Sequence, residues 1–299
     1  MKKQKVAVVC IDPQYDFHDL PDRFKSISSY DENDNPVYIE PALPVPGSWN
    51  DSLRLAEFLK KFKNQINSIF ISFDTHQQYD IAHQMYWRDA SGNHPGPFTQ
   101  ISNNDIKQGK WMPVDPGMMS HVLDYTEALE KEGKYKLIVW PTHCIVGTPG
   151  YSVVQPVMDS VLEWERTRVT RFIPLAKGHN PHTEHYGGCE AEFPMPNDAT
   201  TRLNRNFIDA IEKNDMVIIT GQALSHCVAS TVRQIATYFD EENIKKLVLL
   251  VDTSSSVSGF EKDGQDFISE MSNLGMRVAK TTAFFTSREN GLEFKGESL

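Results

Sequence analysis

Six short runs of apolar, mostly β-branched residues are spread along this chain, and helical patterns lie between most of them. Each run has the length of a buried strand. The runs are Lys5–Ile11, Ser68–Phe73, Val169–Pro174, Met216–Thr220, Lys246–Val251 and Met276–Lys280. The helical patterns are Asn50–Lys63, Val153–Arg166, Leu203–Lys213, Val228–Phe239 and Gly264–Asn273. This alternation predicts an α/β fold: a doubly wound, mostly parallel six-stranded sheet with helices on both faces.

The sequence shows no boundary between two domains. Its 299 residues are enough for two domains or for one large α/β domain, and they contain no internal repeat, low-complexity tract or Pro/Gly/Ser-rich linker. We therefore predict a single domain over residues 1–299. Three segments rich in Pro, Asn, Asp and aromatic residues are predicted to be insertions, at about 18–46, 77–135 and 178–201.

Composition narrows the partners and the cellular compartment. With 39% hydrophobic and 23% charged residues, the chain resembles an ordinary globular protein. Its net charge of −10 argues against nucleic acid as a partner, and no run is long enough to span a membrane. The first apolar run is too short for a signal peptide, and Cys10, Cys144, Cys189 and Cys227 have no CxxC spacing. We expect a cytoplasmic protein that acts on a small molecule, and the sequence is compatible with a homo-oligomer.

Chemically useful side chains follow four of the predicted strands. Ligands of such folds bind beyond the carboxyl ends of the strands, where we expect Asp12, Asp74 with His76, Lys177 and Cys227. The sequence contains no GxGxxG, Walker A or GxSxG motif, and these are the main sequence evidence for a dinucleotide site, a nucleotide site or a serine esterase. The strand ends favour an enzyme that uses a thiol and a metal.

A metal site is suggested by the pair Asp74 and His76. Residues two apart on an extended strand can face the same site, and a carboxylate with an imidazole suits zinc, iron or manganese. Such a pair also occurs often by chance. A third ligand is needed, and spacing does not choose among His83, His94 and His143.

A nucleophilic site is suggested by Asp12, Lys177 and Cys227. Cys227 is expected where a strand ends and a helix begins, so that free backbone N–H groups and the helix dipole stabilise a thiolate. An aspartate can take the thiol proton, and a lysine can fix the charge and orientation of the aspartate. Singly, each has an ordinary explanation as a turn aspartate, a surface lysine or a buried cysteine. Together, three strand ends at one edge of the sheet favour catalysis.

Five segments, in the same order, resemble the motifs of nicotinamidases within the isochorismatase-like cysteine hydrolases. They are IDPQYDF, FDTH, WPTHC, AKG and GQALSHCVAST, and ALPVPGS resembles the segment before the first helix of that family. The resemblance runs from about Val6 to Val278, with longer insertions than most members carry. It implies the isochorismatase-like fold.

The resemblance also implies a role for each matching position. Asp12, Lys177 and Cys227 match the catalytic triad, and the backbone N–H groups of Ala223 and Cys227 match the oxyanion hole. The peptide between Gln222 and Ala223 falls where the family has a cis bond. The implied metal ligands are Asp74, His76 and His143, and the implied ring-binding residues are Phe17, Trp140 and Tyr186. The loop after Asp74 and His76 departs from the family pattern, and His83 is the candidate for a further ligand.

The implied activity is hydrolysis of nicotinamide to nicotinate and ammonia through a cysteine thioester, as part of NAD salvage. The implied cofactor is one divalent metal ion, zinc in the first place, with iron and manganese as alternatives. The main alternative is another cysteine-dependent amidase acting on a bulkier amide, because the insertions border the expected pocket. Asp74, His76 and His143 argue against a metal-free amidase, and Cys227 argues against an isochorismatase. A non-catalytic binding protein would be expected to lack one of these residues.

Overall fold

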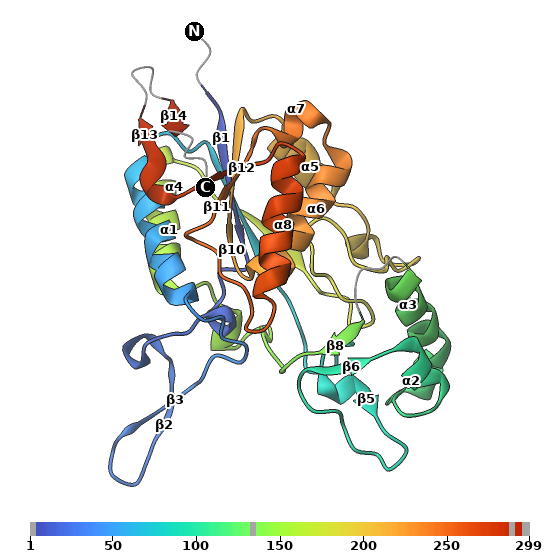
Figure 1. Cartoon of the computed structure of the whole chain (residues 1–299). Helices are drawn as coiled ribbons and strands as arrows, with labels where there is room; N and C mark the ends of the chain where they lie inside the picture. Colours follow the sequence, from blue (N-terminus) through green and yellow to red (C-terminus); the bar gives the residue numbers. More distant parts are fainter. Residues whose placement is uncertain (1–3, 132–135, 287–290, 295–299) are drawn as a thin grey trace.

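The centre of the molecule is a parallel sheet of six strands in the order β12-β11-β10-β1-β4-β9 (Figure 1). The structure is a computed structural model that describes residues 4–131, 136–286 and 291–294. All five pairings in this sheet are parallel. Its strands are β1 (Val6–Ile11), β4 (Ser68–Asp74), β9 (Ile173–Lys177), β10 (Met216–Gly221), β11 (Leu247–Leu250) and β12 (Arg277–Ala279).

The strand β1 shows why these runs form the sheet. All six of its residues are buried, since both faces of the sheet are covered. Ala7, Val9 and Ile11 belong to one hydrophobic core, and Val6, Val8 and Cys10 belong to the other. Such a strand needs apolar side chains at successive positions rather than at alternate ones, as the sequence has them.

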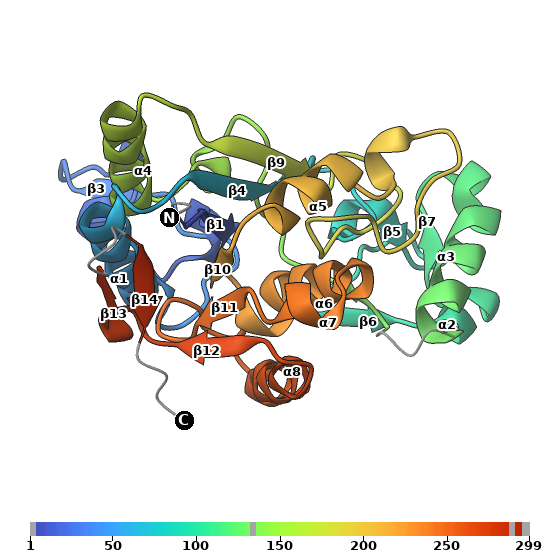
Figure 2. The ribbon, with the colours of Figure 1, turned by 90° about the horizontal axis from the view of Figure 1, so that it is seen from above.

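Helices cover both faces of the sheet, as predicted (Figure 2). Helices α1 (Ser48–Phe62) and α4 (Gln155–Arg168) pack on one face through residues such as Leu55 and Trp164. The other face is covered by α5 (Arg205–Glu212), α6 (Ala229–Tyr238) and α8 (Glu261–Asn273). The short helix α7 (Glu241–Ile244) precedes β11.

One predicted strand was misplaced. The run Val169–Pro174 is not a strand as a whole, because α4 continues to Arg168 and β9 begins only at Ile173. Val169 ends the helix with a φ of 49° and is 92% exposed. Among the described residues, β9 lies at the edge of the sheet and pairs only with β4. It is therefore less buried than the inner strands, and its run of apolar residues is weaker.

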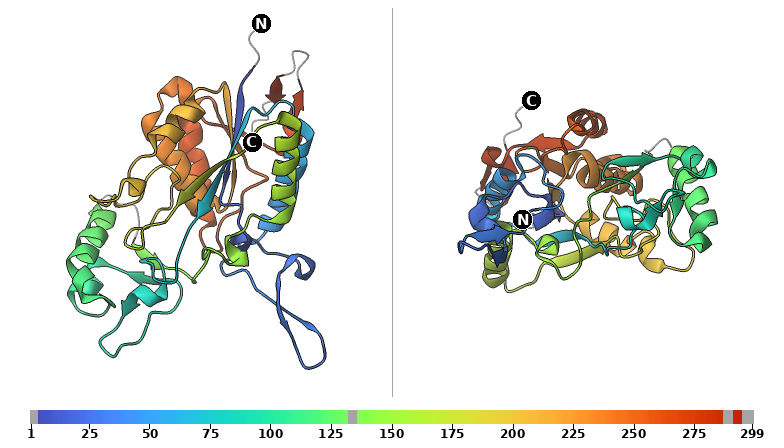
Figure 3. Two further views of the ribbon diagram at one scale, coloured as in Figure 1. Left: turned by 180° about the vertical axis from the view of Figure 1, so that it is seen from behind. Right: turned by 90° about the horizontal axis from the view of Figure 1, so that it is seen from below.

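The long segments between the strands lie at the carboxyl end of the sheet (Figure 3). The segment at 18–46 carries a hairpin of β2 (Ile27–Tyr30) and β3 (Pro36–Tyr38). The segment at 77–135 has a hydrophobic core of its own, which includes Tyr86, Trp87 and Tyr125, and its residues 132–135 lie outside the described residues. The elements there and just after it are β5 (Trp87–Arg88), β6 (Thr99–Ile101), α2 (Asn103–Lys107), β7 (Met112–Pro113), α3 (Met119–Lys131) and β8 (Leu137–Val139). The single domain stays a prediction.

The last two strands of the described residues, β13 (Phe284–Thr286) and β14 (Leu292–Phe294), form a small antiparallel pair. Among the helices of the described residues, none has both the length and the apolar content needed to cross a membrane.

Candidate active site

The strand register brings the predicted site residues to one edge of the sheet. Asp74, the last residue of β4, is paired with Lys177, the last residue of β9. Asp12 directly follows β1, whose last residue is paired with Gly221 at the end of β10. Parallel strands end at the same edge, so residues that are far apart in sequence meet there.

Lys177 joins the nucleophile to both carboxylates. Its Nζ lies 3.0 Å from Asp12 Oδ2, 2.9 Å from Asp74 Oδ1 and 3.6 Å from Cys227 Sγ. All four side chains are buried. A buried ammonium ion would be unstable without opposite charges, and here two carboxylates supply them.

Asp12 is held in a fixed orientation. The hydroxyl of Ser72 donates to Asp12 Oδ1 at 2.6 Å and accepts from the Asp12 N–H at 3.0 Å. The backbone of Asp12 has a φ of 43°, a left-handed conformation that ends the strand and turns the chain. The carboxylate therefore points from the end of β1 toward Lys177.

Cys227 lies in a π-helical turn, Leu224–Val228, between β10 and α6. This is the strand-to-helix junction that the sequence predicts. The peptide between Gln222 and Ala223 is cis, as the resemblance implied. The turn directs the thiol toward the ends of β1 and β9.

The thiolate expected at this junction is not favoured by its surroundings. Burial raises the pKa of Cys227 well above its usual value, and Asp12 and Asp74 add to the effect while Lys177 opposes it. Burial also raises the pKa of Asp12, against the effect of Lys177. Burial disfavours the charged form of Lys177, but Asp12, Asp74 and Cys227 outweigh it and raise the pKa of Lys177. These effects favour the thiol over the thiolate, so the nucleophile needs a base, for which Asp12 is the nearby candidate.

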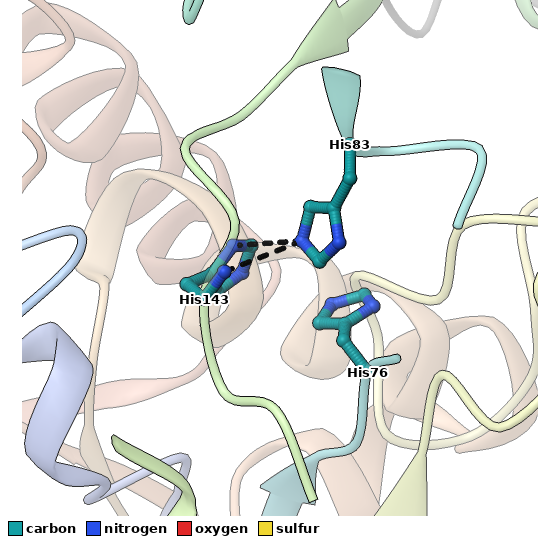
Figure 4. Close-up of side chains that lie close together, drawn as sticks. All are labelled: His76, His83 and His143. Atoms are coloured by element: carbon teal, nitrogen blue, oxygen red, sulfur yellow. Dashed lines mark hydrogen bonds between the residues drawn. The ribbon is translucent and has the colours of Figure 1, made fainter. Parts of the chain in front are cut away.

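Three histidine side chains gather beside this group (Figure 4). The candidate ligand atoms of His76, His83 and His143 lie within 4.8 Å of one another. His83 belongs to the cluster, whereas His94 is exposed and bonds to the backbone of Gln84 and Trp87. Spacing alone could not make this distinction.

Each of the three rings has Nδ1 within hydrogen-bond distance of an oxygen. Nδ1 of His76 lies 2.9 Å from Asp80 Oδ2, that of His83 lies 3.0 Å from the Gln77 carbonyl, and that of His143 lies 2.8 Å from the Pro141 carbonyl. In a neutral ring, these acceptors favour a proton on Nδ1, and Nε2 then keeps the lone pair with which histidine binds metals.

Nε2 of His76 tests whether the site fits a metal. It is buried and lies 3.1 Å from Asp74 Oδ1, yet it makes no hydrogen bond with any residue that the structure describes. Nε2 of His143 lies 3.3 Å from the other oxygen of Asp74. A carboxylate surrounded by imidazole Nε2 atoms is a donor set that suits a divalent transition metal, so the residues fit one.

The same residues interact strongly by charge. Burial disfavours the charged form of Asp74, but His76 and Lys177 outweigh it and hold the pKa of Asp74 well below its usual value. Burial, together with His76 and His143, lowers the pKa of His83 to about 2. Asp74 thus contacts both Lys177 and the histidine cluster, so the two halves of the site share one carboxylate.

A small cavity of about 30 Å³ lies beside the thiol of Cys227 and is also lined by Asp74 and His143. Phe17, Trp140 and Tyr186, the predicted ring-binding residues, all line it together with His143 and Cys227. Trp140 Nε1 donates to the Tyr186 hydroxyl at 2.7 Å, which fixes the two aromatic side chains relative to each other. Tyr186 also borders a larger surface hollow of about 820 Å³.

Some residues of the site were missed by the sequence analysis. Glu184 lines the cavity, and burial raises its pKa to about 7. It lies in a predicted insertion without a recognisable motif, so no signal marked it. Gln14 binds the backbone of Asp74 through both ends of its amide, with Nε2 donating at 2.9 Å and Oε1 accepting at 2.7 Å. It lies in the motif IDPQYDF, which could have pointed to it.

The architecture matches solved structures of nicotinamidases and pyrazinamidases. The yeast nicotinamidase bound to the inhibitor nicotinaldehyde gives a TM-score of 0.60 at 17% identity, covering 92% of this chain and 99% of its own. The Acinetobacter baumanii nicotinamidase/pyrazinamidase gives 0.53 at 15%, covering 94% and 98%. The Pyrococcus horikoshii pyrazinamidase in complex with zinc gives 0.50 at 17%, covering 92% and 98%.

At the level of sequence, no protein-family profile and no curated protein matches the chain. With identities this low, the structural likeness establishes the fold. The predicted isochorismatase-like α/β fold is confirmed.

Proposed function

We propose that the protein is a nicotinamidase that hydrolyses nicotinamide to nicotinate and ammonia through a thioester on Cys227. The observation that carries the proposal is the position of Lys177, whose ammonium contacts Asp12, Asp74 and Cys227 at once. The ammonium group thus joins the nucleophile Cys227 and its base Asp12 to Asp74, a candidate metal ligand. Cys227 and Asp74 also line a cavity with aromatic rings in its wall.

In the first half of the reaction, the carboxylate of Asp12 accepts the thiol proton and Cys227 Sγ attacks the carboxamide carbon. The S–C bond forms, and the electron pair of the C=O π bond moves to the oxygen. The backbone N–H groups of Ala223, which directly precedes the π-helical turn, and of Cys227, which lies within it, donate to this oxyanion. When the C–N bond breaks, Asp12 returns its proton to the nitrogen and ammonia leaves.

In the second half, a water molecule attacks the thioester and gives a proton to Asp12. The S–C bond breaks, nicotinate is released, and the proton returns to Cys227. Lys177 keeps Asp12 ionised and oriented in both halves. The 3.0 Å contact between Lys177 Nζ and Asp12 Oδ2 supports this role.

We propose Asp74, His76 and His143 as ligands of one divalent metal ion, with His83 as a further ligand. Zinc is our first choice, with iron and manganese as alternatives, because the donors are imidazoles and a carboxylate. The Pyrococcus horikoshii relative in complex with zinc supports this choice. When bound, the metal supplies a Lewis acid to which the pyridine nitrogen of nicotinamide can coordinate.

The ring is proposed to lie between Phe17, Trp140 and Tyr186. Aromatic faces and edges bind a planar ring well. A bulkier aromatic amide remains the alternative substrate. The yeast relative bound to nicotinaldehyde supports a pyridine ring with a carbonyl substituent.

The proposal extends to the role of the reaction in the cell. Conversion of nicotinamide to nicotinate belongs to pyridine nucleotide salvage and thus to NAD biosynthesis. All four cysteines are free thiols, which supports a reducing compartment and hence the cytoplasm. The number of subunits stays open.

The test is the release of ammonia from nicotinamide by purified protein supplied with zinc. Cys227→Ala should abolish the release and His76→Ala should weaken it strongly. Cys189→Ala removes another buried thiol and His94→Ala an exposed imidazole, and both should retain activity. If the zinc-supplied wild type releases no ammonia from nicotinamide but does release it from a bulkier aromatic amide, that amide is the substrate and nicotinamide is not. Full activity of Cys227→Ala would refute the thioester.

A further inference from the structure

A buried carboxylate on helix α1 is bonded to the segment that precedes the nucleophile. Asp51 Oδ2 accepts from Gln222 Nε2 at 2.9 Å and from the Ser255 hydroxyl at 2.6 Å. Its other oxygen accepts from Arg54 Nη2 at 2.6 Å. Asp51 and Gln222 are 171 residues apart in sequence and are both almost fully buried.

Gln222 is held from several sides. Its side-chain oxygen accepts from the Ser255 N–H at 3.2 Å, and its own N–H donates to the Ile11 carbonyl at 2.8 Å. On the far side of Ala223, the Leu224 N–H donates to the Ser255 carbonyl at 2.8 Å. The peptide that carries the Ala223 N–H therefore lies between two anchored residues, and Asp51 orients the side chain of one of them.

We infer that Asp51 is a positioning residue for the oxyanion site: through Gln222 it fixes the direction of the Ala223 N–H. This inference rests on the proposed function, in which that N–H stabilises the oxyanion. Oxyanion donors act only when they are already aimed at the position of the developing charge. A loss of orientation should therefore slow the chemical step more than it weakens substrate binding.

A simpler role for Asp51 is to stabilise the start of helix α1, because it lies in the first turn. The hydrogen bonds argue against this as its main role. The N–H groups of Gly47 and Trp49 at that helix end donate to Asp19, each at 2.7 Å. Beyond α1, the carboxylate of Asp51 instead bonds to Gln222 and Ser255.

The test exchanges the donor and the acceptor. In Asp51→Asn, only one acceptor oxygen is left, so Gln222 and Arg54, which donate to different oxygens of Asp51, can no longer both be satisfied. In Gln222→Glu, two carboxylates face each other. In the double variant, the amide introduced at position 51 can donate to one oxygen of the carboxylate introduced at position 222. The other oxygen of that carboxylate can still accept from the Ser255 N–H. Each single variant should lower kcat about tenfold or more with little change in KM, and the double variant should recover most of this loss.

Rates are expressed per reactive thiol, titrated with a thiol reagent, so that a smaller folded fraction does not imitate a slower site. Asp19→Asn is the matched control at the same helix end and should leave kcat unchanged. Ser255→Ala removes one donor to Asp51 without changing any charge, and a lower kcat is expected there also. It provides the test if Asp51→Asn does not fold.

Inhibitor binding supplies a second readout. The thiol of Cys227 can add to the carbonyl group of nicotinaldehyde: the S–C bond forms, the C=O π electron pair moves to the oxygen at the oxyanion site, and Asp12 takes the thiol proton. Nicotinate leaves the thiol unreacted. Asp51→Asn should weaken nicotinaldehyde about tenfold and leave nicotinate unchanged. Equal kcat in the wild type and Asp51→Asn, or no recovery in the double variant, would overturn the inference about Asp51. The proposed function would still be supported by the activity of the wild type. If the wild type acts on another amide only, the same variants are measured with that amide and its aldehyde.

Discussion

Replacing Lys177 by methionine removes an ammonium group that contacts two buried carboxylates. At 3.0 Å and an effective dielectric constant of about 20, the attraction between Lys177 and Asp12 is about 5 kcal/mol. The desolvation of both ions offsets part of it, and removal of one partner from a buried pair typically costs about 3–5 kcal/mol of folding free energy. We expect a loss of that size for Lys177→Met.

The effect on activity follows from the protonation of Asp12. Only its carboxylate can accept the thiol proton, so the acid limb of kcat/KM reports Asp12 in the free enzyme. Since Lys177 lowers the pKa of Asp12, its loss raises that pKa and moves the acid limb to higher pH. At neutral pH the activity should fall about 10²–10⁴-fold, the usual contribution of a general base.

The assay is ammonia release between pH 5 and pH 9, together with urea unfolding of the same preparations. Lys63→Met is the matched control, because Lys63 pairs with Glu163 away from the site and its loss should leave the acid limb in place. If the acid limb lies at the same pH in Lys177→Met and in the wild type, Lys177 does not lower the pKa of Asp12, and the proposed role of Lys177 is refuted. Unchanged stability would refute the buried ion pair.

Three further predictions concern stability, metal binding and the ring pocket. Burial lowers the pKa of His18 to about 4 from its ordinary 6.5, so the unfolded chain binds a proton that the folded chain does not, and folding stability should fall as the pH falls through this interval. The loss reaches about 3 kcal/mol, and urea unfolding of His18→Gln should show a smaller slope with pH. Asp80→Ala removes the acceptor that orients His76 and should weaken zinc binding about 10–100-fold, measured by competition with a chromogenic chelator. An unchanged affinity would contradict our choice of Nε2 as the ligand atom. Trp140→Phe keeps the ring but loses the bond to the Tyr186 hydroxyl, so KM for nicotinamide should rise several-fold with a smaller change in kcat, and equal KM values would argue against a ring site there.

Much of the fold and part of the site could be predicted from the sequence, because both depend on local patterns. An inner strand of a parallel sheet is buried on both faces and so appears as a short continuous apolar run, as β1 and β10 do. Once such strands are parallel, the residues that follow them must meet at one edge. Asp12 and Asp74 could therefore be assigned to one site before any contact was known, and Lys177 joined them although its strand began later than predicted.

Only the tertiary structure decided which residues complete that site and in what state they are. His83 joins the cluster and His94 does not, although both follow β4 in the same insertion. Asp51 reaches Gln222 across 171 residues, and no local period records such a contact. Burial raises the pKa of Cys227 well above its usual value and outweighs the opposite effect of Lys177. Burial and the distance between residues far apart in sequence are properties of the packed molecule, and they control which side chains meet at the site and how their pKa values shift.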